Sequence, residues 1–311
     1  MEENQRRKAL YEQLGLPAPA IEQLERMKKT FDTKQMQKSI ERLTAASTAR
    51  EAYLQLREKL QEDEDGWKML LCQLEAAELC RENYQRQEIG EEIFVDTMRC
   101  FSRFIRECYE MSGRFAFDRG WWTWRQLCMS LFRLGDLECE LCTGEGERVI
   151  SLHIPSDADL LPAAVDRSLG QIGSFVQRYF PQWAAAPMVC DSWLLSPALR
   201  PMLSQSSNIR AFAARFTIKE YRSQDKEFFR WLFAVDTNTP LEQLPEQTGL
   251  QRAAKAYLQA GGIWSDALRP LKTEVACPGR KGGREDEAFQ KQRSGTAGRI
   301  SQLHHPPLCS F

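Results

Sequence analysis

The spacing of apolar residues changes near Gly113, and this change constrains the fold of the 311-residue chain more than any other feature. Before it, apolar side chains recur in steps of three and four, which is typical of amphipathic helices. The clearest such stripe consists of Ile93, Phe94, Met98, Phe101, Phe104, Ile105, Cys108 and Tyr109. After it, Leu137, Cys139 and Leu141 alternate with polar residues, as in a strand with one buried face. We therefore expect a helical N-terminal part followed by a part that contains a β-sheet.

The helical part is expected to be an all-helical bundle of about five helices. Prolines at positions 17 and 19 and glycines at 66 and 90 mark breaks between helical patterns. We place the end of this domain near residue 118 and assign residues 119–268 to a second domain. Residues 269–311 show no periodicity and are rich in Gly, Arg, Lys and Gln, which predicts a disordered tail.

The second domain is expected to mix strands and helices. Glycines 144 and 146 separate two strand patterns, at 137–141 and 149–155, and predict a hairpin. A helix should follow and end at Pro181, with Ser156, Asp157 or Asp159 capping its start. Further patterns indicate strands at 188–190, 209–221 and 228–235 and a last helix at 250–260. This order predicts an α+β or α/β fold, with a mixed β-sheet flanked by helices.

Composition and charge exclude several classes of protein. The net charge of −1 provides no overall basic field, so nucleic acid is not an expected partner. No apolar run approaches the roughly 18 residues of a membrane span, and the first ten residues lack the apolar segment of a secretory signal. Ten cysteines are scattered among core-type residues, as expected of reduced thiols. We expect a cytoplasmic protein without a membrane partner.

The few potential metal ligands argue against a metal site. The chain has three histidines, and two of them, His304 and His305, fall in the expected tail. Cys139 and Cys142 form a single C-x-x-C pattern on an expected strand, where positions i and i+3 point to opposite faces. Packing in the core is therefore favoured for these cysteines over a zinc or redox site.

Two positions at strand ends are candidates for function. His153 ends the second strand of the expected hairpin, just before a loop and the start of a helix. Strand ends in α/β sheets open into ligand-binding crevices, and helix N-termini suit phosphate groups. Asp191 and Ser192 follow the next strand. The alternatives are that His153 packs or caps a loop, and that Asp191 or Ser192 caps a helix.

Other polar and aromatic residues have two interpretations each. Glu138 and Glu140 could act as bases, but a solvated strand face explains them equally well. Trp121, Trp122 and Trp124 form either an apolar core between the two domains or the wall of a binding site, and the core is favoured.

Five sequence blocks carry a family resemblance: FRLGDLECEL, ISLHIP, FVQRYFP, CDSWLLSPAL and SSNIRAFAARF. In this order they resemble the N-acyltransferase N-terminal domain and GNAT-like C-terminal domain that are paired in bacterial acyltransferase domain-containing proteins. The resemblance covers roughly residues 1–268 and is most specific from Trp121 to Trp264. It implies a GNAT-like sheet, acyl-CoA as cosubstrate with no tightly bound cofactor, and a small amine or peptide as acceptor.

The resemblance also implies catalytic roles. An amine that attacks an acyl thioester needs a base for its proton and hydrogen-bond donors for the developing charge. His153 and Glu140 are the base candidates, and Ser192 could protonate the leaving thiolate. Since the strands that end near His153 and Ser192 are neighbours in a GNAT-like sheet, both side chains should face one cleft.

The loop after His153 would bind the cosubstrate, with Ile154, Ser156 and Asp157 as the contacting residues. It departs from the family pattern, because GNAT enzymes wrap the pyrophosphate of coenzyme A with a glycine-rich loop and this loop has no glycine. Pro155 contributes no N–H group, and Asp157 and Asp159 would repel phosphate. The alternative function is therefore a non-catalytic, GNAT-shaped module that binds a ligand or a partner protein.

Overall fold

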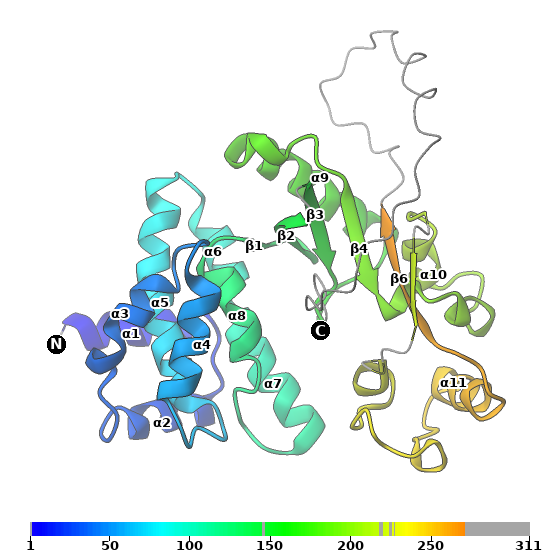
Figure 1. Cartoon of the computed structure of the whole chain (residues 1–311), viewed down its shortest axis with the longest axis horizontal. Coiled ribbons are helices and arrows are strands. Elements are labelled where there is room, and N and C mark those ends of the chain that lie inside the picture. Colours follow the sequence, from blue (N-terminus) through cyan, green and yellow to red (C-terminus); the bar gives the residue numbers. More distant parts are fainter. Residues whose placement is uncertain (1, 145–146, 218–219, 224–225, 227, 271–311) are drawn as a thin grey trace, which may run out of the picture.

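The computed structural model describes residues 2–144, 147–217, 220–223, 226 and 228–270. The two tail histidines, two of the ten cysteines and all but the first residues of the expected disordered tail lie outside these ranges. In the described part, helices gather on one side of the molecule and a twisted sheet with its own helices occupies the other (Figure 1).

Seven α-helices and one 3-10 helix make up the described residues up to 112, so the expected number of helices was too low. They are α1 (Glu2–Gln13), α2 (Ala18–Met27), η1 (Thr33–Met36), α3 (Gln37–Arg42), α4 (Ala49–Lys59), α5 (Trp67–Arg86), α6 (Glu91–Met98) and α7 (Cys100–Ser112). The clearest apolar stripe of the sequence belongs to both α6 and α7, which meet at Arg99. Helix α8 (Gly120–Leu127) carries the three tryptophans and packs on α4 and α5.

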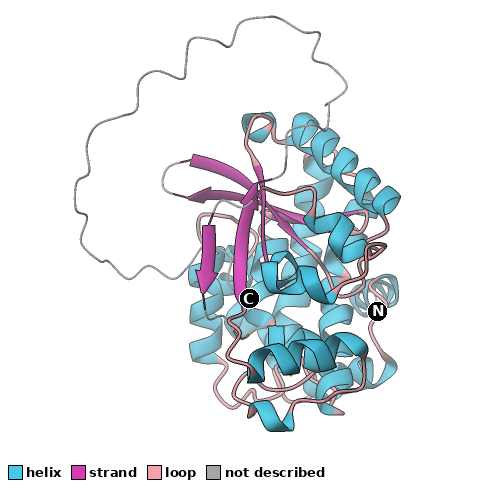
Figure 2. Cartoon of the chain, turned by 90° about the vertical axis from the view of Figure 1, so that its right-hand side faces the viewer, coloured by secondary structure: helices cyan, strands magenta, loops and turns pink. Residues whose placement is uncertain are grey.

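The sheet has six strands in the order β1-β2-β3-β4-β6-β5. The strands are β1 (Leu131–Leu134), β2 (Leu137–Gly144), β3 (Glu147–His153), β4 (Met188–Ser192), β5 (Glu220–Ser223) and β6 (Ser265–Pro270). The expected hairpin is confirmed, since β2 and β3 pair in antiparallel register. Helix α9 (Pro162–Tyr179) connects β3 to β4, which pair in parallel. The mixed sheet, fanned out in Figure 2, confirms the predicted fold class.

Two segments expected to be strands are largely helical. Residues 209–221 contain α10 (Asn208–Ala213), whose start is capped by the Ser207 side chain, and only then reach β5. Ile209, Phe212 and Phe216 are also three and four residues apart, a spacing that fits a helix. Residues 228–235 contain a π-helix, η5 (Phe229–Phe233). The strand prediction failed here because an apolar run of this length fits a strand and a helix equally well.

The last part of the chain adds α11 and the unforeseen strand β6. Helix α11 (Gly249–Gln259) was expected and begins with a capping box between Thr248 and Gln251. Short 3-10 helices form the remaining connections: η2 (Pro181–Trp183), η3 (Trp193–Leu195), η4 (Pro197–Met202) and η6 (Leu241–Gln243).

The start of α9 also differs from the expectation. The helix begins at Pro162, several residues after the proposed caps, and Leu161 precedes it without a side-chain cap. Asp159 instead accepts a hydrogen bond from the backbone N–H of Leu161 at 2.9 Å. Residues 154–161 therefore form an open loop between β3 and α9.

One apolar core joins the helices to the sheet. Phe132 of β1 is fully buried, and its ring contacts Tyr84 of α5 at 5.9 Å and Phe175 of α9 at 4.7 Å between centroids. A second cluster packs η5 and α11 around Trp264. Because the main core is continuous, the boundary near residue 118 stays a prediction. None of the described helices is both long and apolar enough to cross a membrane.

Candidate active site

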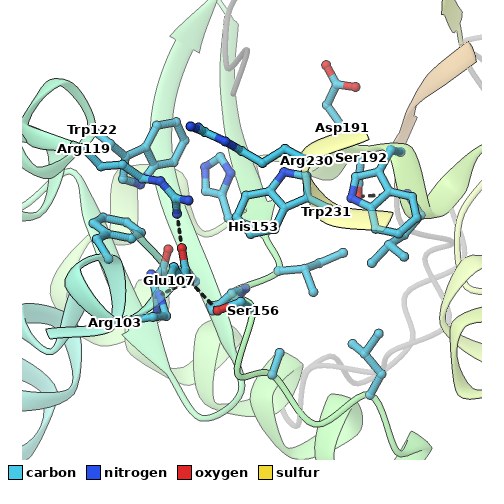
Figure 3. A pocket seen from close by; sticks show the side chains of 18 of the residues that line it. Arg103, Glu107, Arg119, Trp122, His153, Ser156, Asp191, Ser192, Arg230 and Trp231 are labelled. Atoms are coloured by element: carbon cyan, nitrogen blue, oxygen red, sulfur yellow. Dashed lines mark hydrogen bonds and ion pairs between the residues drawn. The ribbon is translucent and has the colours of Figure 1, made fainter. Parts of the chain in front are cut away.

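A cavity of about 290 Å³ lies where the helical part meets the ends of β3 and β4 (Figure 3). Helix α7, the α8 region, the loop after β3 and the π-helix η5 all contribute side chains to its wall. The lining residues are Arg103, Phe104, Glu107, Arg119, Trp121, Trp122, Glu138, His153, Ile154, Pro155, Ser156, Ala158, Leu160, Asp191, Ser192, Trp193, Leu194, Arg230 and Trp231.

The cavity opens where two parallel strands separate. Pairing between β3 and β4 ends at Leu152 and Cys190, and β4 continues by pairing with β6. His153 and Ser192 follow at the two strand ends, and both line the cavity, as expected. Ser192 also caps η3, because its hydroxyl accepts a hydrogen bond from the Leu194 N–H at 3.2 Å.

His153 is held from behind by a carboxylate. Its Nε2 lies 3.0 Å from Oε2 of Glu140 on the adjacent strand β2. The Trp122 ring meets the imidazole edge-on, with 5.0 Å between centroids. Glu140 is not among the residues that line the cavity, so it stands behind the histidine rather than beside a ligand.

The glutamate face of β2 is buried, so its interpretation as a solvated face is wrong. Glu138 and Glu140 are 3% and 7% exposed. Helices α7 and α8 cover them and supply arginine partners: Nη2 of Arg103 donates to Glu138 at 2.7 Å, and Nε of Arg125 donates to Glu140 at 3.1 Å. Burial alone would lower the pKa of Arg103, but the charge and hydrogen bond of Glu138, together with Cys100 and Asp157, outweigh burial and raise it. Paired in this way, the charges can remain buried.

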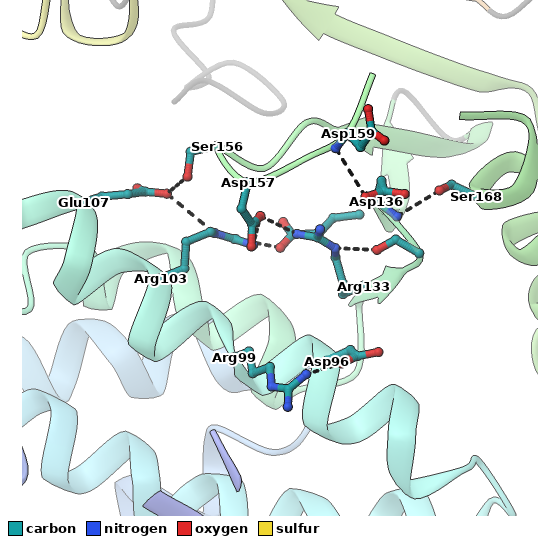
Figure 4. Close-up of polar contacts among 12 residues, drawn as sticks. Asp96, Arg99, Arg103, Glu107, Arg133, Asp136, Ser156, Asp157, Asp159 and Ser168 are labelled. Atoms are coloured by element: carbon teal, nitrogen blue, oxygen red, sulfur yellow. Dashed lines mark hydrogen bonds and ion pairs between the residues drawn. The ribbon is translucent and has the colours of Figure 1, made fainter. Parts of the chain in front are cut away.

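Glu107 of α7 connects the helical part to the loop after β3. Its carboxylate accepts hydrogen bonds from Arg119 and from the Ser156 hydroxyl (Figures 3 and 4). The Arg119 guanidinium lies between two rings, 4.9 Å from the centroid of Phe104 and 5.0 Å from that of Trp231. One wall of the cavity is therefore a buried cluster of charged and aromatic groups.

The three residues expected to bind the cosubstrate are divided between two places. Ile154 and Ser156 line the cavity, whereas Asp157 does not. Asp157 accepts a hydrogen bond from Arg133 at 2.8 Å and lies 3.7 Å from Arg103 (Figure 4). Partial burial would raise the pKa of Asp157, but the hydrogen bond and charge of Arg133, together with Arg103, lower it.

Several lining residues were missed from the sequence. Arg103 and Glu107 come from the part expected to be a plain helical bundle, Arg119 is the first residue after its expected end, and Arg230 and Trp231 come from η5. Arg103 and Glu107 do carry a signal, because they are charged residues four positions apart beside the apolar stripe of α7. For η5 the sequence carries no such signal, and the segment was assigned to a strand.

The cysteines pack in the interior. Cys139 is fully buried, and burial raises the pKa of its thiol, while Cys142 is half-buried. No disulfide links the eight cysteines that the structure describes. Within the same ranges, no group of three or more His, Cys, Asp or Glu side chains could hold a metal ion.

Two family models match the chain. The GNAT-like C-terminal domain matches residues 78–268, and the N-acyltransferase N-terminal domain matches residues 5–129. The two matches overlap over α5 to α8, the helices that supply much of the cavity wall. No curated protein matches the chain.

Solved acyltransferase structures share the fold. A point mutant of an acyltransferase in complex with octanoyl-CoA is 23% identical with a TM-score of 0.71, covering 86% of this chain and 88% of that chain. An acyltransferase in complex with CoA and 10C-teicoplanin is 24% identical with a TM-score of 0.70, covering 85% and 87%. Another, in complex with decanoyl-CoA and teicoplanin, is 24% identical with a TM-score of 0.69 and covers the same shares.

Proposed function

This chain belongs to the family defined by the GNAT-like C-terminal domain and carries an N-acyltransferase N-terminal domain, and from that premise we propose that it transfers an acyl group from acyl-CoA to an amine. One observation carries the proposal: a histidine backed by a carboxylate lines a cavity at the point where two parallel strands separate. Structural relatives bind acyl-CoA, which supports the choice of donor. We also propose the two domains 1–118 and 119–268.

The donor thioester would lie between the ends of β3 and β4. A backbone N–H group at the point where the strands separate would donate to the thioester oxygen. The loop after His153 leads to the N-terminus of α9, where the positive end of the helix dipole suits the phosphates of coenzyme A. Ile154 and Ser156 line the cavity on this side.

The absence of glycine in this loop does not exclude coenzyme A. Repulsion by Asp157 and Asp159 was the electrostatic objection, and Arg133 and Arg103 offset the charge of Asp157. The Ser156 hydroxyl, which donates to Glu107, fixes the loop from the other side. In this chain the loop that would bind coenzyme A is held in place by ion pairs and a hydrogen bond, whereas other GNAT enzymes use a glycine-rich loop.

His153 is the preferred base. Glu140, the other candidate, does not line the cavity and holds the imidazole instead. The amine nitrogen would attack the carbonyl carbon and release its proton to His153. The carbon–sulfur bond then breaks, and the thiolate of coenzyme A takes a proton from the Ser192 hydroxyl, which regains one from solvent.

Apolar residues in the cavity lining support a donor with an aliphatic chain. They are Ile154, Pro155, Ala158, Leu160 and Leu194. A chain buried against these side chains gains about 0.8 kcal/mol for each methylene group. We propose acyl chains of the length found in the related octanoyl-CoA and decanoyl-CoA complexes, rather than acetyl.

A thermal-shift titration with CoA, acetyl-CoA and decanoyl-CoA tests donor binding. A ligand that binds only the native state stabilises it by RT ln(1 + [L]/Kd), so decanoyl-CoA should raise the melting temperature most. No shift with any of the three would contradict the proposal.

Turnover separates the enzyme from the non-catalytic alternative. Release of the coenzyme A thiol from decanoyl-CoA is followed with small amines, with peptides that have free N-termini, and with teicoplanin. Amine-dependent release is expected. Binding of decanoyl-CoA with no release under any of these conditions would favour the ligand-binding module.

A further inference from the structure

We infer that Arg125 is a positioning residue for the base, acting on His153 through Glu140. The inference rests on the proposed function, because it gives His153 the role of base. Arg125 lies on α8 and does not line the cavity, so it would have no contact with a substrate.

The three side chains form a continuous chain of contacts. Nε of Arg125 donates to Oε1 of Glu140 at 3.1 Å, and the other carboxylate oxygen, Oε2, lies 3.0 Å from Nε2 of His153. The Arg125 and Glu140 side chains are 15% and 9% exposed. A charged partner stabilises a carboxylate this buried, and Arg125 is such a partner.

Two tryptophans fix the position of the arginine. The guanidinium carbon of Arg125 lies 4.2 Å from the centroid of Trp122 and 4.6 Å from that of Trp124. Its Nη1 also donates to the backbone carbonyl of Trp121 at 3.4 Å. Trp122 contacts both Arg125 and the His153 ring, so one indole restrains both ends of the chain.

This arrangement selects one tautomer of the histidine. An ionised Glu140 only accepts hydrogen bonds, so Nε2 of His153 must carry the proton that it donates. Nδ1 is then the nitrogen that takes a proton from the acceptor amine. Loss of the Arg125 cation would leave Glu140 more strongly attracted to an imidazolium, which makes His153 harder to deprotonate.

Other charged groups also face His153, among them Arg119 and Arg230, which line the same cavity (Figure 3). Glu138 lies opposite His153 in the β2–β3 register, and its charge is paired with Arg103 of α7. Asp191 is on β4, and Cys128 follows α8, where burial raises the pKa of its thiol. Arg125 pairs directly with Glu140.

Nuclear magnetic resonance tests the inference without a substrate. With three histidines in the chain, the His153 ring can be assigned by comparison with His153→Gln, and its ¹⁵N shifts report tautomer and pKa. Arg125→Met and Arg125→Gln should raise the pKa of His153 by roughly one unit, because a nearby positive charge is removed while Glu140 stays beside the imidazole. If only one of the two variants folds, that variant is enough for the test.

The matched control is Arg148→Met. Arg148 also stacks on a tryptophan, 5.0 Å from the Trp183 centroid, and donates to a backbone carbonyl, but it lies at the opposite end of β3. It should leave the His153 signals unchanged. An unchanged pKa of His153 in the folded Arg125 variants would overturn the inference.

The pH profile of amine acylation from decanoyl-CoA gives the second readout. Since the base must be neutral, a raised pKa of His153 should make the Arg125 variants lose more activity at pH 6 than at pH 9. An equal loss at both pH values would indicate a purely structural role and overturn the inference. If no amine is acylated at all, the proposed function fails, and the magnetic resonance titration still decides the role of Arg125.

Discussion

Removal of the Glu107 carboxylate should destabilise the protein, because the buried positive charge of Arg119 is then poorly compensated. In Glu107→Ala, Arg119 loses its closer ion-pair partner and keeps Asp118, whose Oδ1 lies 3.9 Å from Nε, while its side chain stays only 6% exposed. Breaking a buried pair in this way costs about 3–5 kcal/mol. Arg103 keeps Glu138, and Phe104 and Trp231 still contact Arg119, so we expect the lower end, about 3 kcal/mol.

Urea unfolding followed by tryptophan fluorescence measures this loss. The control is Glu51→Ala, whose partner Arg42 belongs to an exposed pair with side-chain exposures of 26% and 63%, and where a loss of at most about 1 kcal/mol is expected. A double variant, Glu107→Leu with Arg119→Met, should recover most of the stability, because no unpaired charge remains.

Two results would refute this reasoning. The first is a loss in Glu107→Ala no larger than in Glu51→Ala, which would mean that the cluster is effectively solvated. The second is a double variant as unstable as Glu107→Ala itself, which would place the effect in packing rather than in charge.

Three further predictions concern single side chains. Trp122→Ala should destabilise the protein by roughly 3–5 kcal/mol and the half-buried Trp124→Ala by clearly less, and equal melting temperatures would show that burial is not the cause. Among the described cysteines, Cys142 should react first with a thiol reagent in the native state, because the others are buried; mass mapping that finds Cys139 modified first would contradict this. Asp157 has a lowered pKa in the folded state, so it contributes stability above its unfolded pKa that is lost as the pH falls through the folded value. The parent should therefore lose more stability than Asp157→Asn between neutral pH and about pH 3, and parallel pH curves would contradict the ion pair.

The sequence predicted those parts of the fold that depend on local periodicity. The β2–β3 hairpin, helix α11 and the helical N-terminal part follow from spacing and turn residues. Residues 228–235 could not be assigned correctly, because a short apolar run satisfies strand and helix alike and tertiary packing around Trp264 decides. Strand β6 was missed because its pairing with β4 and β5 is entirely non-local.

For the site, sequence reasoning brought His153 and Ser192 to one cavity, since both follow strands that a GNAT-like sheet places side by side. It did not foresee that Glu140 would lie behind His153, because that contact depends on strand register. It also could not show that Arg103 and Arg125 cover the glutamate face, since partners 35 and 15 residues away leave no periodic signal.

Acylation kinetics of His153→Ala test the central proposal most directly. Transfer from decanoyl-CoA to an amine accepted by the parent is measured together with decanoyl-CoA binding. If His153 is the base, turnover should fall by roughly 10²-fold or more while donor binding is retained. Turnover equal to that of the parent, with donor binding intact, would show that the reaction does not use this histidine as its base.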